Sequence, residues 1–296
     1  MVFNIANPGH VRLIGTLLAA VLLATACQPG VRAGTSASVS PSPKSATHVF
    51  VIVLENTSYQ LALRQPYIAS LSRQYAVATN YSAVALPSLP NYLAMTSGST
   101  WGIRDDNYHQ LPAGGIGSQL SDAGISWKAY MEGFTGDCFD SPYPYALKHN
   151  PFAYYGGACP SNVVPMTDLA ADLNGGTPQL SWITPGLCND GHDCSVRTAD
   201  RWLSQVVPQI TSSPAWRKDG VLFITWDESS SSDSRVALLV VAPSLRGQIT
   251  MPLDHYSLSA TISDQLGVAR LGRAQQATSL SKQLQAARAQ ATPSGG

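Results

Sequence analysis

The chain has 296 residues, of which 44% are hydrophobic and 12% are charged. This composition excludes an intrinsically disordered chain and is sufficient for a large buried core. Lys and Arg together number 18, as do Asp and Glu, so the formal net charge is zero. We expect one large domain. Because no excess of positive charge exists to attract a phosphate backbone, we do not expect it to bind nucleic acid.

Residues 1–27 have the pattern of an export signal. His10 and Arg12 precede an apolar run, 13–24, which has the length of a signal-peptide core and is too short to span a bilayer comfortably. The run ends in Leu-Ala-Thr-Ala-Cys, which resembles the lipobox of bacterial lipoproteins, although Ala24 stands where that motif usually has Leu, Val or Ile. We expect export, followed either by lipidation and membrane attachment through Cys27 or by plain secretion.

The segment after the signal is rich in small and polar residues. Residues 28–47 have neither helical nor strand periodicity, which is typical of a flexible tether. The folded domain is expected over 48–267. A C-terminal tail, 268–296, is rich in Gln, Ala, Arg and Ser and is expected to hold at most one marginal helix.

Cysteine usage predicts two disulfides. Once Cys27 is set aside, four of the five cysteines remain, an even number that suits an oxidising compartment. Of the three possible connectivities we favour Cys138 with Cys159 and Cys188 with Cys194, because each pair closes a short loop rich in Gly or Pro. Neither pair has the Cys-x-x-Cys spacing of a zinc site.

Within the expected domain, short apolar runs alternate with amphipathic segments. The runs with the length and composition of buried strands are 49–54, 125–130, 180–184, 221–226 and 236–242. The segments with apolar residues at helical spacing are 66–75, 117–123, 198–210 and 256–266. Strands interleaved with helices indicate an α/β fold, in which helices cover both faces of a mostly parallel sheet. Ligands in such folds bind beyond the carboxyl ends of the strands.

Polar residues follow two of the predicted strands directly. Glu55 and Asn56 come after the first run, and Asp227 and Glu228 come after the fourth. Carboxylates brought to one edge of a sheet repel one another unless a cation or a shared proton intervenes. The pattern predicts a divalent metal site, and the alternative is a set of solvated loop acids.

A third polar segment packs Asp190, His192 and Asp193 into a turn after the strand 180–184. His and Asp in one tight turn can ligate a metal or bond a phosphoryl oxygen, and the alternative is an ordinary loop histidine. His255, at the start of the last predicted helix, has the same two interpretations.

Ser88 precedes a proline that suits the first turn of a helix. Pro90 at that position would put Ser88 near the N-cap. One interpretation is that the hydroxyl only caps the helix. The helix dipole and free backbone donors would also lower the cost of an alkoxide there and bind a phosphate.

Taken together, these segments resemble the bacterial phosphoesterase family, whose members include secreted acid phosphatases and phospholipases C. The segments that carry the resemblance, in family order, are HVFVIVLENTSY (48–59), PSLPNYLAMTSG (87–98), NDGHD (189–193), FITWDE (223–228) and HYSL (255–258). KHNPF (148–152) also resembles a family segment near the site. The resemblance covers roughly 48–267 and is strongest to the short acid phosphatases. It implies an alkaline-phosphatase-like three-layer sandwich.

The resemblance also implies a ligand set and a nucleophile. The residues implied to surround a divalent metal are Glu55, Asn56, Ser88, Asp227 and Glu228. Ser88 would attack phosphorus and form a phosphoserine that water hydrolyses. The serine-rich run 229–234 departs from the family pattern and leaves open whether Glu228 faces the metal.

Further roles are implied for three polar side chains and one acid. Asn91 would donate to a non-bridging oxygen, or else would bond the backbone at the start of its helix. His192 and His255 would bind transferring oxygens, protonate the leaving group or ligate a second metal. Asp190 would orient His192 or join that second metal.

We therefore expect a metal-dependent phosphatase of the acid phosphatase type that acts outside the cytoplasmic membrane. Its substrate would be a phosphorylated small molecule or a lipid head group. A phosphodiesterase or phospholipase C using the same site is the alternative. Two further alternatives are an extracytoplasmic ligand-binding lipoprotein and a catalytically inactive family member.

Overall fold

The computed structural model of the protein describes residues 47–291. The predicted signal segment, Cys27 and residues 28–46 of the predicted tether lie outside the described residues, so export and lipidation stay predictions. No helix among the described residues is both long enough and apolar enough to cross a membrane.

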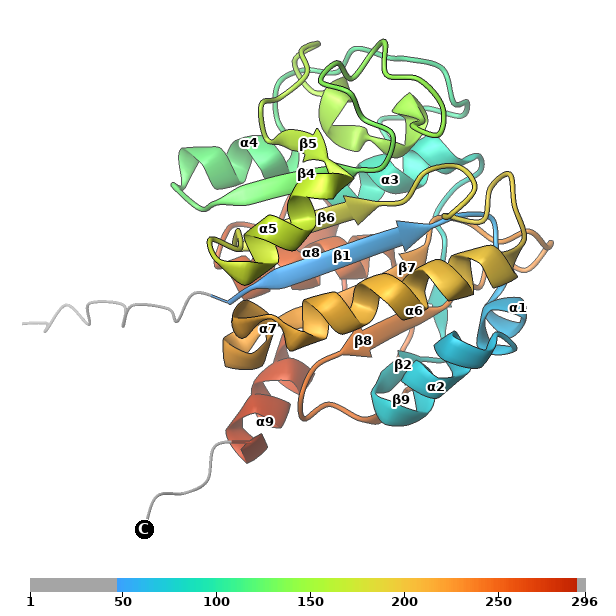
Figure 1. The fold of residues 1–296 in the computed structure, drawn as a ribbon, viewed down its shortest axis with the longest axis vertical. Coiled ribbons are helices and arrows are strands. Elements are labelled where there is room, and N and C mark those ends of the chain that lie inside the picture. The colour runs from blue at the N-terminus through green and yellow to red at the C-terminus, as the bar shows by residue number, and fades with distance from the viewer. Residues whose placement is uncertain (1–46, 292–296) are drawn as a thin grey trace, which may run out of the picture. The chain divides into compact units, whose positions relative to one another are not determined.

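An eight-stranded sheet lies at the centre of the described residues (Figure 1). Its strands, in spatial order, are β5 (Val163–Pro165), β4 (Trp127–Met131), β6 (Leu180–Thr184), β1 (Val49–Leu54), β7 (Val221–Trp226), β8 (Leu238–Val241), β2 (Ala76–Ala78) and β9 (Gly247–Ile249). Neighbouring strands are parallel except where β8 pairs with β7 and with β2. The predicted α/β fold with a mostly parallel sheet is confirmed.

Helices cover both faces of this sheet (Figure 1). One layer contains α2 (Pro66–Gln74), α5 (Leu169–Asn174), α6 (Val196–Ser212) and α7 (Pro214–Asp219). The other contains α3 (Ser88–Ser97), α4 (Gly115–Asp122) and α8 (His255–Leu266). The remaining elements are α1 (Tyr59–Leu63), α9 (Ser281–Ala291), the short 3-10 helices η1 (Leu147–His149), η2 (Pro151–Tyr154), η3 (Met166–Asp168) and η4 (Gly272–Gln275), and the paired strands β3 (Tyr81–Ser82) and β10 (Leu253–Asp254).

The central strand β1 is buried because all six of its residues are apolar and both of its edges are paired. Ile52 lies opposite Ile183 of β6 on one side and opposite Ile224 of β7 on the other. An apolar run without polar alternation is typical of a strand covered on both faces. Each large aliphatic side chain buried in this way stabilises the fold by about 1.5–3 kcal/mol, so the point at which β1 ends is firmly held.

The last helix of the layer, α8, has a defined cap at each end. Asp254 accepts a hydrogen bond from the backbone N–H of Ser257 at 2.8 Å, so the helix begins at His255, one residue before the predicted start. Gly267 ends it with φ of 74°, in the left-handed region that glycine adopts at low cost.

Both predicted disulfides are present. Cys138 is bonded to Cys159, and Cys188 is bonded to Cys194. The connectivity favoured from the short loops is confirmed.

The segment that follows α8 packs against the same core. Leu280 and Leu284 are buried in the main hydrophobic cluster. The guanidinium of Arg270 donates to both carboxylate oxygens of Asp264, at 2.8 and 2.6 Å, and Ser279 donates to the same carboxylate at 2.7 Å. Although burial opposes it, these bonds and the charge of Arg270 lower the pKa of Asp264.

We expect Asp264→Asn to lower the melting temperature at pH 7, and we expect its difference from wild type to shrink below about pH 4. The pKa of Asp264 is lowered in the folded state, so its contribution to stability is present above the unfolded pKa and is lost as the pH falls through the folded pKa. Thermal melts at neutral and acidic pH check this. Asp122→Asn, at the exposed end of α4, is the matched control. An equal loss at both pH values would contradict the assignment.

Candidate active site

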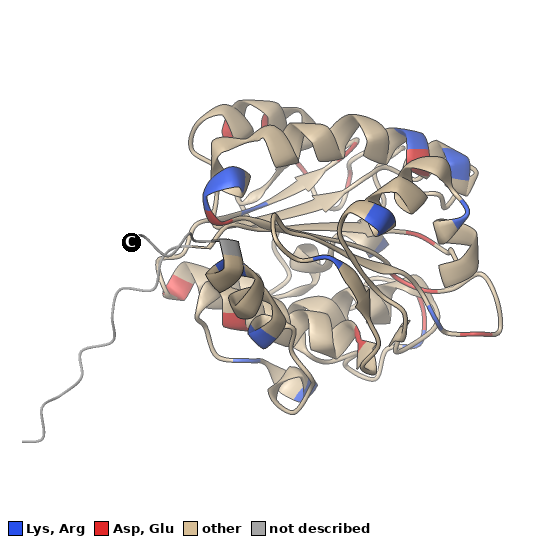
Figure 2. Cartoon of the chain, turned by 90° about the horizontal axis from the view of Figure 1, so that it is seen from below, with Lys and Arg blue, Asp and Glu red and all other residues tan. Residues whose placement is uncertain are grey.

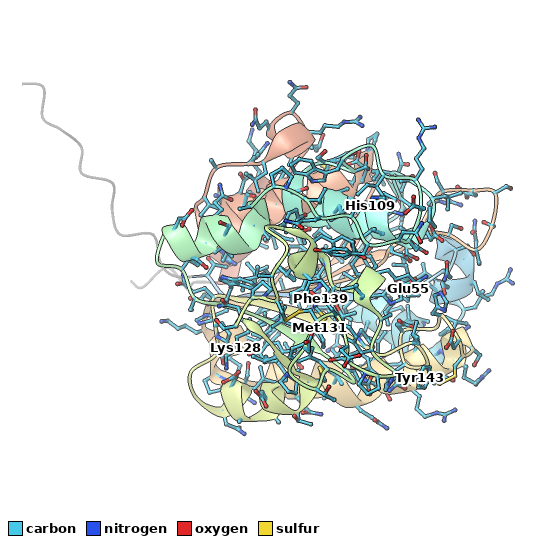
Figure 3. All side chains as sticks on the ribbon, turned by 90° about the horizontal axis from the view of Figure 1, so that it is seen from above. Glu55, His109, Lys128, Met131, Phe139 and Tyr143 are labelled. Carbon is cyan, nitrogen blue, oxygen red and sulfur yellow. A yellow bond between two sulfur atoms is a disulfide. The ribbon has the colours of Figure 1, made fainter. Side chains whose placement is uncertain are left out.

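The ends of β1 and β7 bring three of the predicted acids together. The two strands run parallel with Leu54 opposite Trp226, so Glu55 and Asp227 follow them at the same edge of the sheet. Glu55 lies on the side toward which β1 points (Figure 1, Figure 3). Glu55 and Asp227 are fully buried, and only 8% of Glu228 is exposed. The sheet thus places these carboxylates in the interior rather than in solvent.

Asn56 links the two strand ends. Its backbone N–H donates to Asp227 Oδ1 at 3.1 Å, and its side-chain Nδ2 lies 3.5 Å from Glu55 Oε2. Its φ is 49°, in the left-handed region, which asparagine enters more readily than most residues. Such backbone conformations persist where the surroundings over-determine them, as they often do at functional sites.

Ser88 is the first residue of α3, and its hydroxyl faces Glu55. Ser88 Oγ donates to Glu55 Oε2 at 3.0 Å, and the residue is 1% exposed. The N-cap position belongs to Pro87, one residue before Ser88, and Pro90 lies in the first turn. The hydroxyl is therefore at the positive end of a ten-residue helix, where negative charge on its oxygen is stabilised.

Two buried residues for which the sequence analysis assigned no role, Tyr92 and His149, contact Glu55. Tyr92 follows Ser88 by one helical turn, and its hydroxyl donates to Glu55 Oε1 at 2.6 Å. The Tyr92 ring stacks on His149 with centroids 5.3 Å apart. The His149 nitrogens lie 3.2 Å from Glu55 Oε1 and 3.2 Å from Asp190 Oδ2. The sequence could have indicated Tyr92 as a site residue, because it follows Ser88 by one helical turn. For His149 the one indication was its position in the 148–152 segment.

Asp190 and His192 come from the loop after β6. Asp190 is fully buried, and its Oδ1 accepts the backbone N–H of His192 at 2.7 Å. The His192 ring lies 5.7 Å from the His149 ring, centroid to centroid, and its Nδ1 is 2.7 Å from Asp193 Oδ1. The predicted pairing of Asp190 with His192 is thus a contact to the His192 backbone, while Asp193 contacts the ring.

This loop is held at several points. The disulfide between Cys188 and Cys194 closes it. Glu132, directly after β4, accepts hydrogen bonds from Gly186 N at 2.7 Å and from Asn189 Nδ2 at 2.8 Å. These contacts fix the loop that presents both predicted residues to the site.

Asn91 has a different role from the predicted donation to a substrate oxygen. Its Oδ1 accepts from the backbone N–H groups of Val84 and Ala85, both at 3.0 Å. Its Nδ2 donates to the carbonyls of Ala85 and Pro87 at 3.0 and 3.1 Å. A primary amide has two donors and two acceptor positions, so all four are used. Asn91 therefore holds the loop that leads to Ser88, which is the alternative the sequence had left open.

His255 is likewise occupied at both ring nitrogens. Its Nε2 lies 2.5 Å from the carbonyl oxygen of Asp227, and its Nδ1 lies 2.7 Å from the hydroxyl of Tyr81. A carbonyl only accepts, so Nε2 carries the proton and Nδ1 accepts from Tyr81. Burial lowers the pKa of His255 to about 4, so the ring is neutral. This geometry indicates that His255 positions Asp227, whereas the sequence had predicted that His255 contacts the transferring oxygens.

Comparison with known proteins identifies the family. A family model described as the phosphoesterase family matches residues 62–269, which is more than half of the chain. The chain belongs to the phosphoesterase family. The predicted resemblance to a phosphoesterase family is confirmed.

Two relatives illustrate the range of this family. The chain is 30% identical over 244 residues to a phosphate-repressible acid phosphatase of Penicillium chrysogenum, covering 75% of this chain and 59% of that protein. It is 29% identical over 272 residues to a phosphatidylinositol-3-phosphatase of Mycobacterium tuberculosis, covering 87% and 88% of the two chains. The chain thus spans about three fifths of the length of the fungal relative and most of the mycobacterial one.

A solved structure supports the fold assignment. A protein of the alkaline phosphatase superfamily from Vibrio parahaemolyticus aligns with a TM-score of 0.55 and 12% identity, covering 77% of this chain and 69% of that chain. The predicted alkaline-phosphatase-like architecture is confirmed.

Four buried carboxylates of the chain are gathered at one edge of the sheet. Acidic and basic residues elsewhere are interspersed over helices and loops (Figure 2). Apart from Asp200, whose carboxylate accepts from the backbone N–H groups of Tyr67 and Ile68, the buried carboxylates among the described residues are those of Glu55, Asp190, Asp227 and Glu228. We call these four, together with Ser88, His149 and His192, the carboxylate site.

The carboxylates of this site do not ionise equally. Burial, together with the charges of Glu55 and Glu228, raises the pKa of Asp227 well above its usual value. Burial and the charge of Glu55 raise the pKa of Glu228 to about 7. Burial would also raise the pKa of Glu55, but His149 lowers it below its usual value. Burial opposes a charge on His149, but Glu55 and Asp190 raise its pKa to about 10. The positive charge of His149 compensates mainly Glu55, so it compensates Asp227 and Glu228 less strongly.

The donor atoms of the site fit a divalent cation. Four buried carboxylate oxygens among the described residues take part in no hydrogen bond: Asp190 Oδ2, Asp227 Oδ2 and Glu228 Oε2 in this site, and Asp219 Oδ2 outside it. Glu55, His149 and His192 each offer one ligand atom, and these atoms lie within 4.8 Å of one another. Carboxylate oxygen and imidazole nitrogen are common ligands of divalent metals. The carboxylates and His192 therefore fit the metal implied by the family resemblance, and His149 would join the set by giving up the proton that Glu55 and Asp190 stabilise on it.

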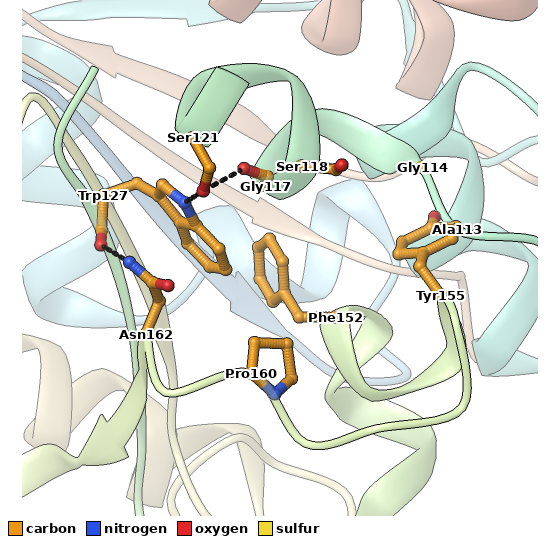
Figure 4. Close-up of a pocket in the computed structure, with 10 residues that line it drawn as sticks. All are labelled: Ala113, Gly114, Gly117, Ser118, Ser121, Trp127, Phe152, Tyr155, Pro160 and Asn162. Atoms are coloured by element: carbon orange, nitrogen blue, oxygen red, sulfur yellow. Dashed lines mark hydrogen bonds between the residues drawn. The ribbon is translucent and has the colours of Figure 1, made fainter. Parts of the chain in front are cut away.

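A separate cavity of about 220 Å³ lies outside the carboxylate site (Figure 4). Trp127 and Phe152 stack at its wall with centroids 5.0 Å apart. A Cβ added at Gly117 would meet the Trp127 ring at 2.8 Å, so the close approach of α4 requires glycine there. Phe152 of η2 connects this packing with the segment that carries His149.

We expect Tyr92→Phe to lower the free energy of unfolding by about 1–3 kcal/mol, because buried Glu55 loses a donor while the ring can still stack on His149. Tyr130→Phe is a matched control, since Tyr130 is also fully buried and its hydroxyl donates to Asp172 Oδ2 at 2.7 Å. Chemical denaturation should show both losses. Calorimetric titration with a divalent metal should show weaker binding only for Tyr92→Phe. Unchanged metal affinity in Tyr92→Phe would contradict the conclusion that the Tyr92 hydroxyl positions Glu55.

Proposed function

We propose that this phosphoesterase hydrolyses phosphate monoesters in a metal-dependent reaction with Ser88 as the nucleophile. The hydrogen bond from Ser88 Oγ to Glu55 Oε2 is the observation that carries the proposal. A buried hydroxyl beside an ionised carboxylate, at the positive end of a helix, is favourably placed to lose its proton. The names of the fungal and mycobacterial relatives, an acid phosphatase and a phosphatidylinositol-3-phosphatase, support a phosphate monoester as substrate.

The proposed metal ligands are Glu55, Asn56, Ser88, Asp227 and Glu228, with Asp190, His149 and His192 beside them. A divalent metal bound there would polarise a phosphoryl oxygen and favour the ionised Ser88 hydroxyl. Ser88 Oγ then attacks phosphorus in line, the bond to the leaving oxygen breaks, and a phosphoserine forms. Water cleaves the phosphoserine and releases inorganic phosphate. His192 is the proposed contact for the oxygens that are transferred.

The proposed substrate is a phosphorylated small molecule or a lipid head group. The mycobacterial relative, whose name specifies a phosphoinositide, supports the second of these. Diester hydrolysis would use the same nucleophile and the same carboxylates. The choice between the two reactions therefore depends on groups around the phosphate rather than on Ser88.

Ser88→Ala should reduce the release of p-nitrophenol from p-nitrophenyl phosphate by about 10³-fold or more, because the residue that forms the covalent bond is lost. Ser97→Ala is the matched control, since Ser97 is buried on the same helix and donates to the backbone carbonyl of Leu93 at 2.8 Å. A chelator should abolish wild-type turnover, and added divalent metal should restore it.

The same assay distinguishes the alternatives. Faster hydrolysis of the bis-p-nitrophenyl ester than of the monoester would favour the phosphodiesterase or phospholipase C type. Binding of phosphate without turnover of either ester would contradict an enzyme and favour a ligand-binding lipoprotein or an inactive family member.

A further inference from the structure

Lys148 brings a positive charge to the edge of the carboxylate site. Its Nζ lies 3.0 Å from Asp106 Oδ2 and 3.1 Å from His192 Nε2, and 22% of its side chain is exposed. Over residues 47–291, Lys148 is the one Lys or Arg whose side chain forms a described hydrogen bond with a member of that site. It is therefore placed to meet an anion that approaches Ser88 from solvent.

Asp106 holds Lys148 in a defined position relative to the nucleophile. One oxygen of this carboxylate, Oδ2, accepts from Lys148 Nζ. The other, Oδ1, accepts from the backbone N–H of Leu89 at 3.0 Å, and Leu89 directly follows Ser88. A single carboxylate thus ties the ammonium group to the first turn of α3. Because Asp106 acts through Lys148 and the helix, it is a positioning residue.

The ammonium group has more donors than its observed contacts use. An ammonium carries three N–H donors, and Asp106 and His192 account for two of them within the described part of the chain. The third is available to an oxygen atom of a bound substrate. A charge-assisted bond of this kind is stronger than one between neutral groups.

The charge of Lys148 distinguishes two classes of phosphate ester. A monoester near neutral pH is mostly a dianion with three non-bridging oxygens, whereas a diester is a monoanion with two. The buried carboxylates repel the dianion more strongly than the monoanion, so a cation held at the edge of the site beside His192 benefits the monoester more. We infer that Lys148 binds the third non-bridging oxygen of a phosphate monoester and thereby selects monoesters over diesters, an inference that rests on the proposed function of the site.

The test compares hydrolysis of p-nitrophenyl phosphate and its bis ester by the full chain and by Lys148→Met. The ratio of the two kcat/KM values, monoester over diester, should fall about ten- to hundred-fold, mainly through KM of the monoester. Lys148→Arg should restore part of the ratio. Lys128→Met is the matched control and should leave the ratio unchanged, because Lys128 forms a comparable partly exposed ion pair, 2.7 Å from Asp172, outside the site.

Binding of inorganic phosphate provides a second readout that needs no turnover. Calorimetric titration of the metal-loaded full chain should show about ten-fold or greater loss of phosphate affinity in Lys148→Met. Lys148→Gln, which keeps polarity without charge, serves the same purpose if the methionine variant does not fold. Asp106→Asn should weaken phosphate binding in the same direction.

The outcomes separate this inference from the proposed function. An active wild type with an unchanged ester ratio or unchanged phosphate affinity in Lys148→Met overturns the role of Lys148 and leaves the function standing. If wild type hydrolyses neither ester, the proposed function fails, and the phosphate titration alone decides whether Lys148 binds the anion. A wild type that hydrolyses neither ester and binds no phosphate overturns both.

Discussion

Mutual repulsion among buried carboxylates is the constraint around which this site is built. Glu55 is stabilised in its ionised form by His149, by the Tyr92 hydroxyl and by Ser88. Asp227 and Glu228 each keep a buried oxygen that takes part in no hydrogen bond among the described residues. Uncompensated buried charge destabilises a fold, and a bound cation removes that cost. The atoms that make the metal-free chain less stable are thus the atoms proposed to bind a metal.

The fold supports this arrangement through residues that do not belong to the carboxylate site. Parallel pairing of β1 with β7 sets the separation of Glu55 and Asp227. His255 bonds the carbonyl of Asp227, and Asn91 bonds the loop before Ser88. Glu132 bonds the loop that carries Asp190 and His192. Supporting contacts of this kind orient ligands and nucleophiles, and their loss commonly reduces metal affinity or activity.

The sheet was predictable because its central strands are buried on both faces. Strand β1 is a continuous apolar run, β7 is apolar apart from Thr225, and β6 is a mostly apolar segment, so all three can be recognised from their length and composition. Strands β2, β5 and β9 have three residues each and no comparable signal. They form because neighbouring strands already present free backbone groups. Burial of Leu280 and Leu284 was equally hidden, since the tail resembles an isolated, marginal helix in sequence.

The site was predictable where local sequence determines position. Residues that directly follow parallel strands lie at the same edge of a sheet, so the proximity of Glu55 and Asp227 was predictable from sequence alone. The role of His149 depends on stacking against Tyr92 and on contacts with Glu55 and Asp190, which no local pattern encodes. For His255, residue type suggested chemistry, but its partner Tyr81 is distant in sequence and determines its state.

The most direct test of the account is thermal unfolding of wild type and Asp227→Asn with chelator and with excess divalent metal. Asparagine keeps an acceptor for the Asn56 N–H and removes the charge. The account predicts that Asp227→Asn melts at a higher temperature than wild type when metal is absent. It also predicts that metal raises the wild-type melting temperature by several degrees, corresponding to about 3 kcal/mol at a hundred-fold excess over Kd, and has little effect on the variant. A wild type indifferent to metal, with a variant less stable in chelator, would contradict it.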